Sequence, residues 1–272
     1  NYCSPVIWEV DGKKQIVVAA TLRVVGYDFE SGEEVWTVRG LSRVVCTTPV
    51  IGEDGRLYVA GWARGGDAGE RISLAPFAEK IGEVDANGNG EIEHSELAEE
   101  KDSDLERRYQ LIDRDKSGGI TEIEYETYRN IFDEAQNVIL TIAPGGEGDI
   151  TETHVAWRYE RHVPFCASLV VADGTVFGIK DGGILTTLDA GSGEALKTAR
   201  LAGNGNYYAS PVIGDGKLFA VDQNGELSVV RAAPEWDIVS SADFEEEVYA
   251  TPAIVDGRLY LRTSGHLYCF GS

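Results

Sequence analysis

Short apolar runs alternate with Asp-Gly pairs along most of the chain, and this pattern predicts β-hairpins. A phrase made of one hydroxyl residue and three residues that are Pro or apolar begins five times, at Ser4, Thr48, Ser168, Ser210 and Thr251. An Asp-Gly pair follows each phrase within a few residues, and a second apolar run comes next. Because Asp-Gly accepts the positive φ angles of a tight turn, each pair of runs predicts one hairpin.

The hairpins belong to a longer repeating unit. A second turn at 182–183, 224–225 and 264–265 leads into a third apolar run, and a fourth run is expected near 35–36, 156–157, 196–197 and 235–236. Successive phrases begin 44, 120, 42 and 41 residues apart. Four short strands in about 41–44 residues is the period of a β-propeller blade, which buries its two faces only by stacking against other blades.

Two units carry a further pattern after the third strand. It is Asp28-x-x-Ser31-Gly32-x-x-x-Trp36 in the first unit, and Asp189-x-x-Ser192-Gly193-x-x-x-Lys197 in the third. The pattern resembles the Asp-x-x-Thr-Gly-x-x-x-Trp repeat of propellers related to pyrroloquinoline quinone (PQQ) enzymes. This resemblance implies an all-β propeller of four-stranded blades. The sequence departs from the family where Lys197 replaces Trp, and in the second and fourth units, which lack the Asp and the Gly.

The number of units predicts an incomplete propeller. About five blades are present, and the last ends at Phe270 after its third strand. Propellers of the resembled kind have seven or eight blades and close with a strand from the N-terminal end. We therefore expect that blades are missing upstream of Asn1, or that the termini pair with another chain. Either arrangement leaves strand edges exposed in this chain alone.

One insertion explains the long spacing of 120 residues. The second blade continues normally to Gly61-Trp62, and its third strand resumes at 138–142. The predicted domains are 1–63 (blade 1 and the first half of blade 2), 64–135 (the insert) and 136–272 (the rest of blade 2 and blades 3–5). The insert holds 20 acidic and 9 basic residues, which is about half of the excess negative charge of the chain.

Two segments of twelve residues in the insert, 85–96 and 113–124, place oxygen-bearing groups at regular positions. Gly90 and Gly118 stand at position 6, where the chain must turn sharply. Both segments resemble EF-hand loops, and the resemblance implies two bound calcium ions. The candidate ligands are Asp85, Asn87, Asn89, Glu91, Glu93 and Glu96 in the first loop, and Asp113, Asp115, Ser117, Gly119, Thr121 and Glu124 in the second.

The flanks of both loops predict helices with one apolar face. Positions −1, −4 and −8 before each loop are apolar, and Ile92 and Ile120 at position 8 are placed to pair as a short β-bridge. Only 16 residues separate Glu96 from Asp113, and the chain contains no Met, the residue that lines the target grooves of calcium sensors. A structural or buffering role is therefore favoured over a sensor role. The alternative to calcium binding is a degenerate pair of EF-hands kept as a helical spacer.

Net charge excludes some partners. At −22, the chain is not expected to bind nucleic acid or anionic membrane surfaces, which select basic patches. No apolar run reaches the roughly 18–20 residues that span a bilayer. The family resemblance implies an exported protein that is periplasmic, on the cell surface or extracellular.

Two functions follow from the resemblance and the absence of any nucleophile–base pattern in the repeats. The first is a non-catalytic binding or scaffold propeller, with calcium ordering the insert next to one face and an unknown protein or small molecule bound on that face. The alternative is a PQQ-dependent quinoprotein dehydrogenase. Trp36, Trp157 and Trp236 recur at blade positions, which favours packing between blades over stacking on a quinone.

Four cysteines lie far apart, at Cys3, Cys46, Cys166 and Cys269, without the spacing of a zinc site. Cys46 and Cys166 occupy the same place in two repeat units. This placement favours buried, small apolar residues over bonded partners.

Overall fold

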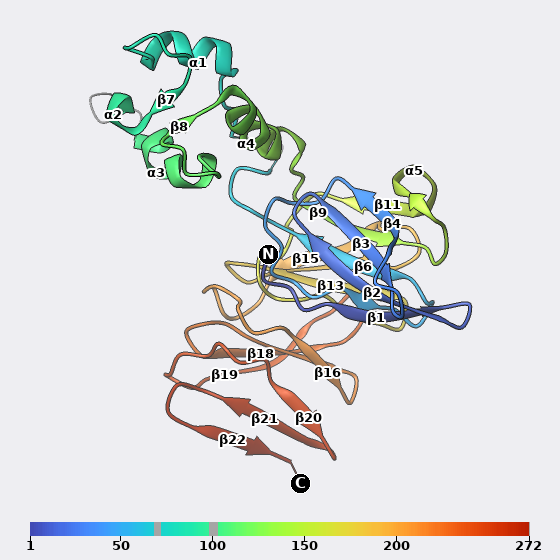
Figure 1. Ribbon diagram of the computed structural model, residues 1–272. Helices are drawn as coiled ribbons and strands as arrows, with labels where there is room; N and C mark the ends of the chain where they lie inside the picture. Colours follow the sequence, from blue (N-terminus) through green and yellow to red (C-terminus); the bar gives the residue numbers. More distant parts are fainter. Residues whose placement is uncertain (68–71, 98–102, 272) are drawn as a thin grey trace. The chain divides into compact units, whose positions relative to one another are not determined.

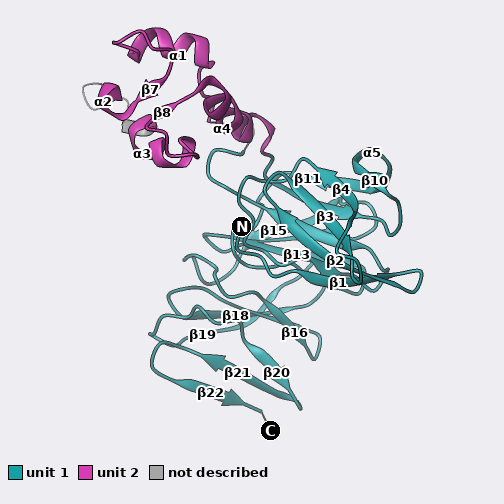
Figure 2. Cartoon of the chain, viewed as in Figure 1, with its two compact units in different colours: residues 1–67, 136–272 teal, residues 68–135 magenta. Residues whose placement is uncertain are grey.

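The computed structural model describes residues 1–67, 72–97 and 103–271. The chain divides into two compact units (Figures 1 and 2). Unit 1 consists of residues 1–67 and 136–272, and unit 2 is the intervening segment Ala68–Ala135. Residues 64–67, where the predicted insert begins, belong to unit 1. There the Asp67 carboxylate accepts hydrogen bonds from Asn137 (3.0 Å) and Trp62 (3.3 Å).

Within the described residues, unit 1 contains five sheets whose blade strands pair antiparallel, which confirms the predicted all-β architecture of successive blades. The first four sheets have four blade strands each, and the fifth has three. Blade 1 contains β1 (Val6–Val10), β2 (Lys13–Ala20), β3 (Arg23–Asp28) and β4 (Glu34–Arg39); blade 2 contains β5 (Val50–Ile51), β6 (Leu57–Gly61), β9 (Val138–Ile142) and β11 (Val155–Tyr159). Blade 3 contains β12 (Val170–Ala172), β13 (Thr175–Lys180), β14 (Ile184–Asp189) and β15 (Ala195–Arg200). Blade 4 contains β16 (Val212–Gly214), β17 (Lys217–Val221), β18 (Glu226–Arg231) and β19 (Ile238–Asp243), and blade 5 contains β20 (Ala253–Val255), β21 (Arg258–Arg262) and β22 (Leu267–Phe270).

The first hairpin of most blades turns as the sequence predicts. Asp11 and Gly12 have φ of 50° and 75°, and the Asp-Gly pairs of blades 3, 4 and 5 have the same left-handed conformation. These angles define the tight two-residue turn that matches the twist of the strands. Blade 2 differs because its turn is longer, and only Gly55 of its Asp-Gly pair has a positive φ.

The Asp-x-x-Ser-Gly pattern forms one turn in two blades. The Asp28 carboxylate accepts hydrogen bonds from the Ser31 amide (2.8 Å) and hydroxyl (3.0 Å), and these bonds lower the pKa of Asp28. Asp189 and Ser192 repeat both bonds at 2.8 and 2.9 Å. The next residue is Gly with φ of 72° or 74°, a conformation that favours glycine. The pattern is therefore a requirement of the turn between the third and fourth strands.

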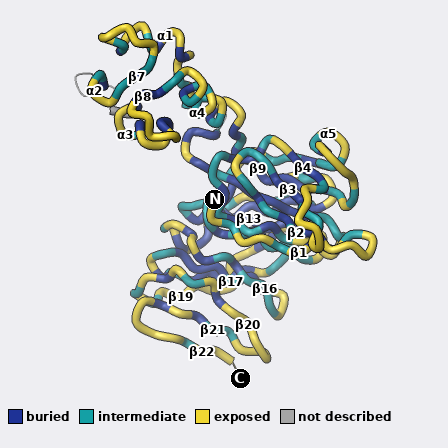
Figure 3. The backbone as a smooth tube through the Cα atoms, viewed as in Figure 1, coloured by how far each residue is buried: buried dark blue, intermediate teal, exposed yellow. Residues whose placement is uncertain are grey.

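The core lies between consecutive blades. In β6, Leu57 and Val59 pack in a cluster with blade 1, whereas Tyr58 and Ala60 pack in a cluster with blade 3. Successive side chains of a strand point to opposite faces, so a central blade is buried on both sides. Burial decreases toward the last blade, where β20 is exposed along its whole length (Figure 3).

Each predicted packing tryptophan is buried in one of these clusters. Trp36 lies between blades 1 and 2, Trp157 between blades 2 and 3, and Trp236 between blades 3 and 4. Lys197, which replaces Trp in the repeat, has its Nζ 5.0 Å from the ring centroid of Trp236, a cation–π contact. The expected fourth strand at 235–236 is wrong: β19 begins at Ile238, after the Trp236 side chain has packed between the blades.

In three of the repeated phrases, the hydroxyl of the first residue bonds one blade to the next. The Ser168 hydroxyl accepts a hydrogen bond from the Thr48 amide at 3.0 Å. Ser210 and Thr251 accept equivalent bonds from the amides of Ser168 and Ser210, both at 3.0 Å. Each of these hydroxyl groups therefore joins the segments that lead into the first strands of two neighbouring blades.

A segment of blade 2 covers the outer edge of blade 1. The short strand β10 (Gly148–Asp149) pairs with β4, and the helical turn α5 (Thr151–His154) follows it. Asp149 forms an ion pair with Arg39 at 2.9 Å, and the Ile150 side chain is buried in the core between blades 1 and 2. This addition closes an edge that would otherwise expose unpaired backbone groups.

A substitution at Gly183 can test how closely blades 3 and 4 approach each other. Gly183 has φ of 74°, and a Cβ atom there would lie 2.0 Å from the Gly203 carbonyl oxygen. We expect Gly183→Ala to lower the free energy of unfolding by about 3 kcal/mol or more, because backbone must move. Gly216→Ala is the matched control: φ is 65° with open space around it, so we expect only about 1 kcal/mol. Urea unfolding of both variants measures the difference, and equal losses would contradict the steric argument.

Candidate metal centre in unit 2

Unit 2 contains two helix–loop–helix segments joined by a short β-ladder. The first contains α1 (Phe77–Val84), β7 (Ile92–Glu93) and α2 (His94–Leu97), and the second contains α3 (Ser103–Ile112), β8 (Gly119–Ile120) and α4 (Glu122–Glu134). The two strands are antiparallel, and Ile92 lies opposite Ile120. The predicted pairing of these two isoleucines is confirmed.

The apolar flanks of the two loops form one core. The predicted residues at −1, −4 and −8 from each loop all belong to this cluster, and only Ile81 among them is partly exposed. Ile92, Leu97, Ile120 and Tyr125 complete the cluster and are at most 3% exposed. The core holds the two loops at a fixed spacing through the β-ladder.

The two loops share an unusual backbone conformation. Positions 4 and 6 are Gly88 and Gly90 in the first loop, with φ of 74° and 85°. The same positions in the second loop are Lys116 and Gly118, with φ of 60° and 94°. Left-handed residues at both positions bend the chain around a common centre, and a lysine adopts this conformation only at a steric cost.

Acidic groups converge inside the second loop. One carboxylate oxygen from each of Asp113, Asp115 and Glu124 lies within 4.8 Å of the others. Asp113 is only 7% exposed, and its two oxygens accept bonds from the amides of Ser117 (3.1 Å) and Gly118 (3.2 Å). The loop therefore wraps its own amides around the carboxylate at position 1.

Glu124 closes the second loop. Its carboxylate accepts hydrogen bonds from the amides of Arg114 (2.9 Å) and Thr121 (3.0 Å), at opposite ends of the loop. Thr121 also caps α4, because its hydroxyl accepts a bond from the Glu124 amide in a capping box. Burial raises the pKa of Glu124, but the hydrogen bonds from Thr121, Arg114 and Asp115 outweigh it and lower the pKa overall. The carboxylate is thus held as an anion at the loop centre.

The first loop repeats this closure, with neutral amide side chains at positions 3 and 5. Asp85 accepts bonds from the amides of Gly88 (2.7 Å) and Gly90 (3.0 Å), and Glu96 accepts bonds from those of Ala86 (2.8 Å) and Glu93 (2.9 Å). Two amide side chains take the places that Asp115 and Ser117 have in the second loop. They belong to Asn87 and Asn89, and both donate to the Glu93 carboxylate, at 3.2 and 3.0 Å.

The remaining predicted ligands offer neutral oxygens. The Gly119 carbonyl accepts a bond from the Ser117 hydroxyl at 3.0 Å, so these two donors lie together. The Glu91 side chain lies against Gly119, where an added Cβ would be 2.3 Å from its carboxylate. The carboxylate of Glu91 therefore lies against the β-ladder, and the Glu91 backbone carbonyl is the group that can face the loop centre. The donor set is made of hard oxygens, which fits calcium or magnesium better than zinc.

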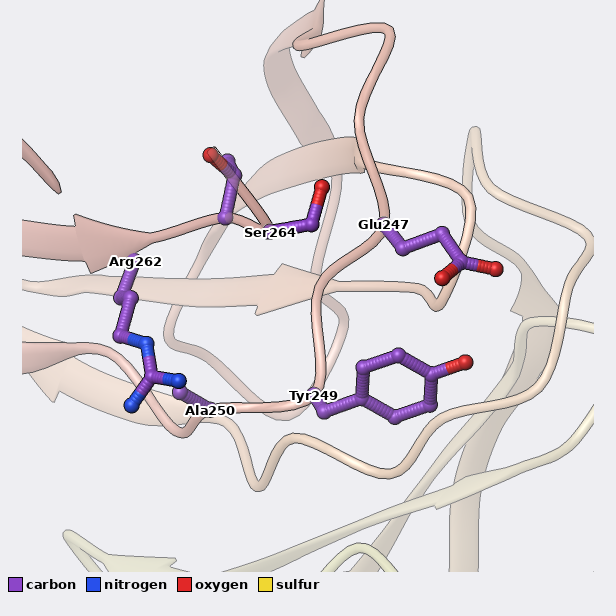
Figure 4. A pocket seen from close by; sticks show the side chains of 6 residues that line it. Glu247, Tyr249, Ala250, Arg262 and Ser264 are labelled. Carbon is purple, nitrogen blue, oxygen red and sulfur yellow. The ribbon is translucent and has the colours of Figure 1, made fainter. Parts of the chain in front are cut away.

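A small pocket with a volume of about 290 Å³ lies beside blade 5 of the propeller. In Figure 4, Glu247, Tyr249 and Ala250 from the segment before β20 lie beside Arg262 and Ser264. Ligand pockets usually have volumes of about 300–1,000 Å³, so this hollow is at the lower limit. It does not by itself indicate a ligand.

The structure corrects the interpretation of two cysteines. Cys46 and Cys166 are half-buried rather than buried, and each thiol affects the pKa of the other, so the two lie close together. They meet because the same position in two consecutive blades lies on the adjacent segments that lead into β5 and β12. That signal was available in the repeat spacing, since the two cysteines belong to neighbouring units.

Neither a protein-family model nor a curated protein matches this sequence. Among solved structures, BamB from Moraxella catarrhalis aligns over 99% of this chain with a TM-score of 0.55 and 14% identity. The chain spans 58% of the length of that BamB chain. A quinohemoprotein alcohol dehydrogenase from Pseudomonas putida HK5 aligns over 39% of this chain and 18% of its own, with a TM-score of 0.32 and 15% identity.

The likeness to BamB and the sheets described above establish a β-propeller fold. At this level of identity the comparison concerns the fold alone. No helix in the described ranges is long and apolar enough to cross a membrane.

Proposed function

We propose that unit 2 is an EF-hand pair that binds two calcium ions, and that the propeller is a non-catalytic binding scaffold. The observation that carries the proposal is the convergence of Asp113, Asp115 and Glu124 within 4.8 Å. Three carboxylates at this separation repel one another, and a bound divalent cation offsets the repulsion. The closed loop of amides around them keeps the carboxylates together.

Calcium accounts for the donor set better than other common metals. Calcium takes six to eight oxygen ligands in a flexible geometry, and a glutamate at position 12 can offer both of its oxygens. Magnesium demands a smaller octahedral shell, and zinc prefers nitrogen and sulfur. Positions 1, 3, 5, 7, 9 and 12 of both loops carry an oxygen donor. We therefore assign calcium as the ligand of both loops, with a dissociation constant of about 10⁻⁷ to 10⁻⁴ M.

The insertion point gives calcium binding a structural consequence. Unit 2 connects Gly61 at the end of β6 to Val138 at the start of β9, and these two residues pair directly in blade 2. Both ends of the calcium module are thus anchored at one hairpin. Calcium would order the module without requiring the blade to change.

The scaffold role rests on how the propeller uses its aromatic residues. Trp36, Trp157 and Trp236 are at most 8% exposed and fill the spaces between blades, so none of them is free to stack on a cofactor. The propeller partner would be a protein or a small molecule bound on a blade face. An exported location would suit calcium sites at the weak end of the range, because calcium modules outside cells work at about 10⁻⁴ to 10⁻³ M calcium.

Calorimetric titration of the whole, calcium-stripped chain tests the proposal. We expect two calcium ions per chain, and weaker binding of magnesium because the loops are built for a larger shell. Thermal unfolding with and without calcium provides a second readout, in which binding to the folded state raises the melting temperature. Absence of calcium binding at millimolar calcium would overturn the assignment.

A further inference from the structure

One position in the repeat brings consecutive blades together. It lies two residues before each repeated phrase and is occupied by Tyr2, Cys46, Cys166, Tyr208 and Tyr249. The Tyr2 amide donates to the Val45 carbonyl at 2.8 Å, next to Cys46. The rings of Tyr208 and Tyr249 are in contact, with centroids 5.5 Å apart. Side chains at this position are therefore neighbours from one blade to the next.

Cys46 and Cys166 occupy this position in blades 2 and 3. Two residues further along both segments, just before β5 and β12, the Thr48 amide bonds to the Ser168 hydroxyl at 3.0 Å, which fixes the register between the blades. Each thiol affects the pKa of the other, so the two lie close together, and both are half-buried. Burial raises the pKa of both thiols, to about 12 for Cys166.

We propose that Cys46 and Cys166 form a reversible disulfide that links blade 2 to blade 3. The oxidant is a second disulfide, either of a small thiol or of a thiol oxidoreductase. One thiolate attacks that disulfide and forms a mixed disulfide, and the other thiolate then displaces the second thiol of the oxidant. Two thiols of the chain are oxidised, one disulfide is reduced to two thiols, and the two protons pass to the reduced oxidant.

The other two cysteines are placed differently. The Cys3 thiol donates to the Ala19 carbonyl of its own blade at 3.0 Å. Cys269 lies on β22 opposite Tyr260 in the last sheet and is exposed. Cys3 also lies near enough to Cys46 to raise the pKa of the Cys46 thiol, but Cys166 affects that pKa more strongly, so the pair in blades 2 and 3 is favoured.

The bond would close a long covalent loop. Residues 46 to 166 include nearly all of blade 2 and the whole of unit 2. A disulfide that closes a long loop removes much freedom from the unfolded chain, so its effect on stability is expected to be large. The bond would tie the blade that carries the calcium module to its neighbour.

Peptide mapping of the full chain with Cys3→Ser and Cys269→Ser tests the inference. After incubation with oxidised glutathione at pH 8.5 or above, where more thiolate is present, remaining thiols are alkylated and the chain is cut with trypsin. We expect peptides 44–56 and 162–180 to be joined, and dithiothreitol to separate them. Separate glutathione adducts on the two peptides, or two alkylated peptides after prolonged oxidation, would overturn the proposal.

Thermal unfolding of the same variant gives an independent readout. We expect oxidation to raise the melting temperature by about 5–10 °C, and reduction to reverse the change. Adding Cys46→Ser or Cys166→Ser to this background should abolish both the joined peptides and the shift. A shift that persists in either of these variants would contradict a bond between the two residues.

Discussion

Replacing Glu124 by Gln is expected to remove calcium binding from the second loop and to leave the first loop nearly unchanged. The substitution keeps the size of the side chain, but it removes one of three converging carboxylates and one oxygen of a two-oxygen ligand. We expect the affinity of this loop to fall by roughly 100-fold or more, which corresponds to about 2.8 kcal/mol. Calorimetric titration should then detect one remaining site.

The matched control is Glu122→Gln. Glu122 is exposed in the first turn of α4, two residues from Glu124, and removal of its charge makes the same change in net charge. We expect two sites in this variant with at most a small loss of affinity. Glu96→Gln should produce the converse result, with only the second loop still binding. Two sites of parental affinity in both Glu96→Gln and Glu124→Gln would refute the assignment.

Trp36→Ala is expected to be the most destabilising single substitution in blade 1. The side chain is 1% exposed, contacts Trp8 edge-to-face at 5.9 Å, and packs over Gly26, where any Cβ would collide with it. Its Nε1 donates to Gln15 Oε1 at 2.7 Å inside the core. Truncation leaves a large cavity between blades 1 and 2, and we expect a loss of about 3–5 kcal/mol in the free energy of unfolding.

Urea unfolding measures this loss, and two further variants separate its causes. Trp36→Phe retains much of the apolar volume but leaves Gln15 without its donor, so we expect an intermediate loss. Phe29→Ala truncates an aromatic residue that is 48% exposed, and we expect a loss below about 1 kcal/mol. If Trp36→Ala and Phe29→Ala had equal effects, the core between blades 1 and 2 would not have the predicted role.

Local patterns determined the elements that need only short-range contacts. Asp11-Gly12 and its equivalents predicted tight turns, because two left-handed residues in sequence are sufficient to reverse a strand. The loops at 85–96 and 113–124 were placed residue by residue for the same reason. Each closes on itself through bonds between residues ten or fewer positions apart, such as the Arg114 amide to Glu124. Ile92 and Ile120 could be paired because the two loops repeat one pattern.

Contacts between blades were only partly predictable. The repeat indicated that tryptophans pack between blades, but it did not show that the Ser168 hydroxyl bonds to the Thr48 amide 120 residues earlier. Nor did it show that Ile150 and the strand β10 cover the edge of blade 1. Such contacts depend on which segments the stacked blades place side by side. Local sequence patterns do not determine that placement.

The sequence by itself determined a bladed β fold, the position of its insert and the order of donor groups in two candidate calcium loops. These features follow from periodicity and from turn and loop geometry, which act within a few residues. Only the tertiary structure decided which side chains meet between blades, and Cys46 and Cys166 show the reason. Their shared place in two repeat units favoured buried, small apolar residues, whereas stacking of blades 2 and 3 brings the thiols close enough to affect each other's pKa.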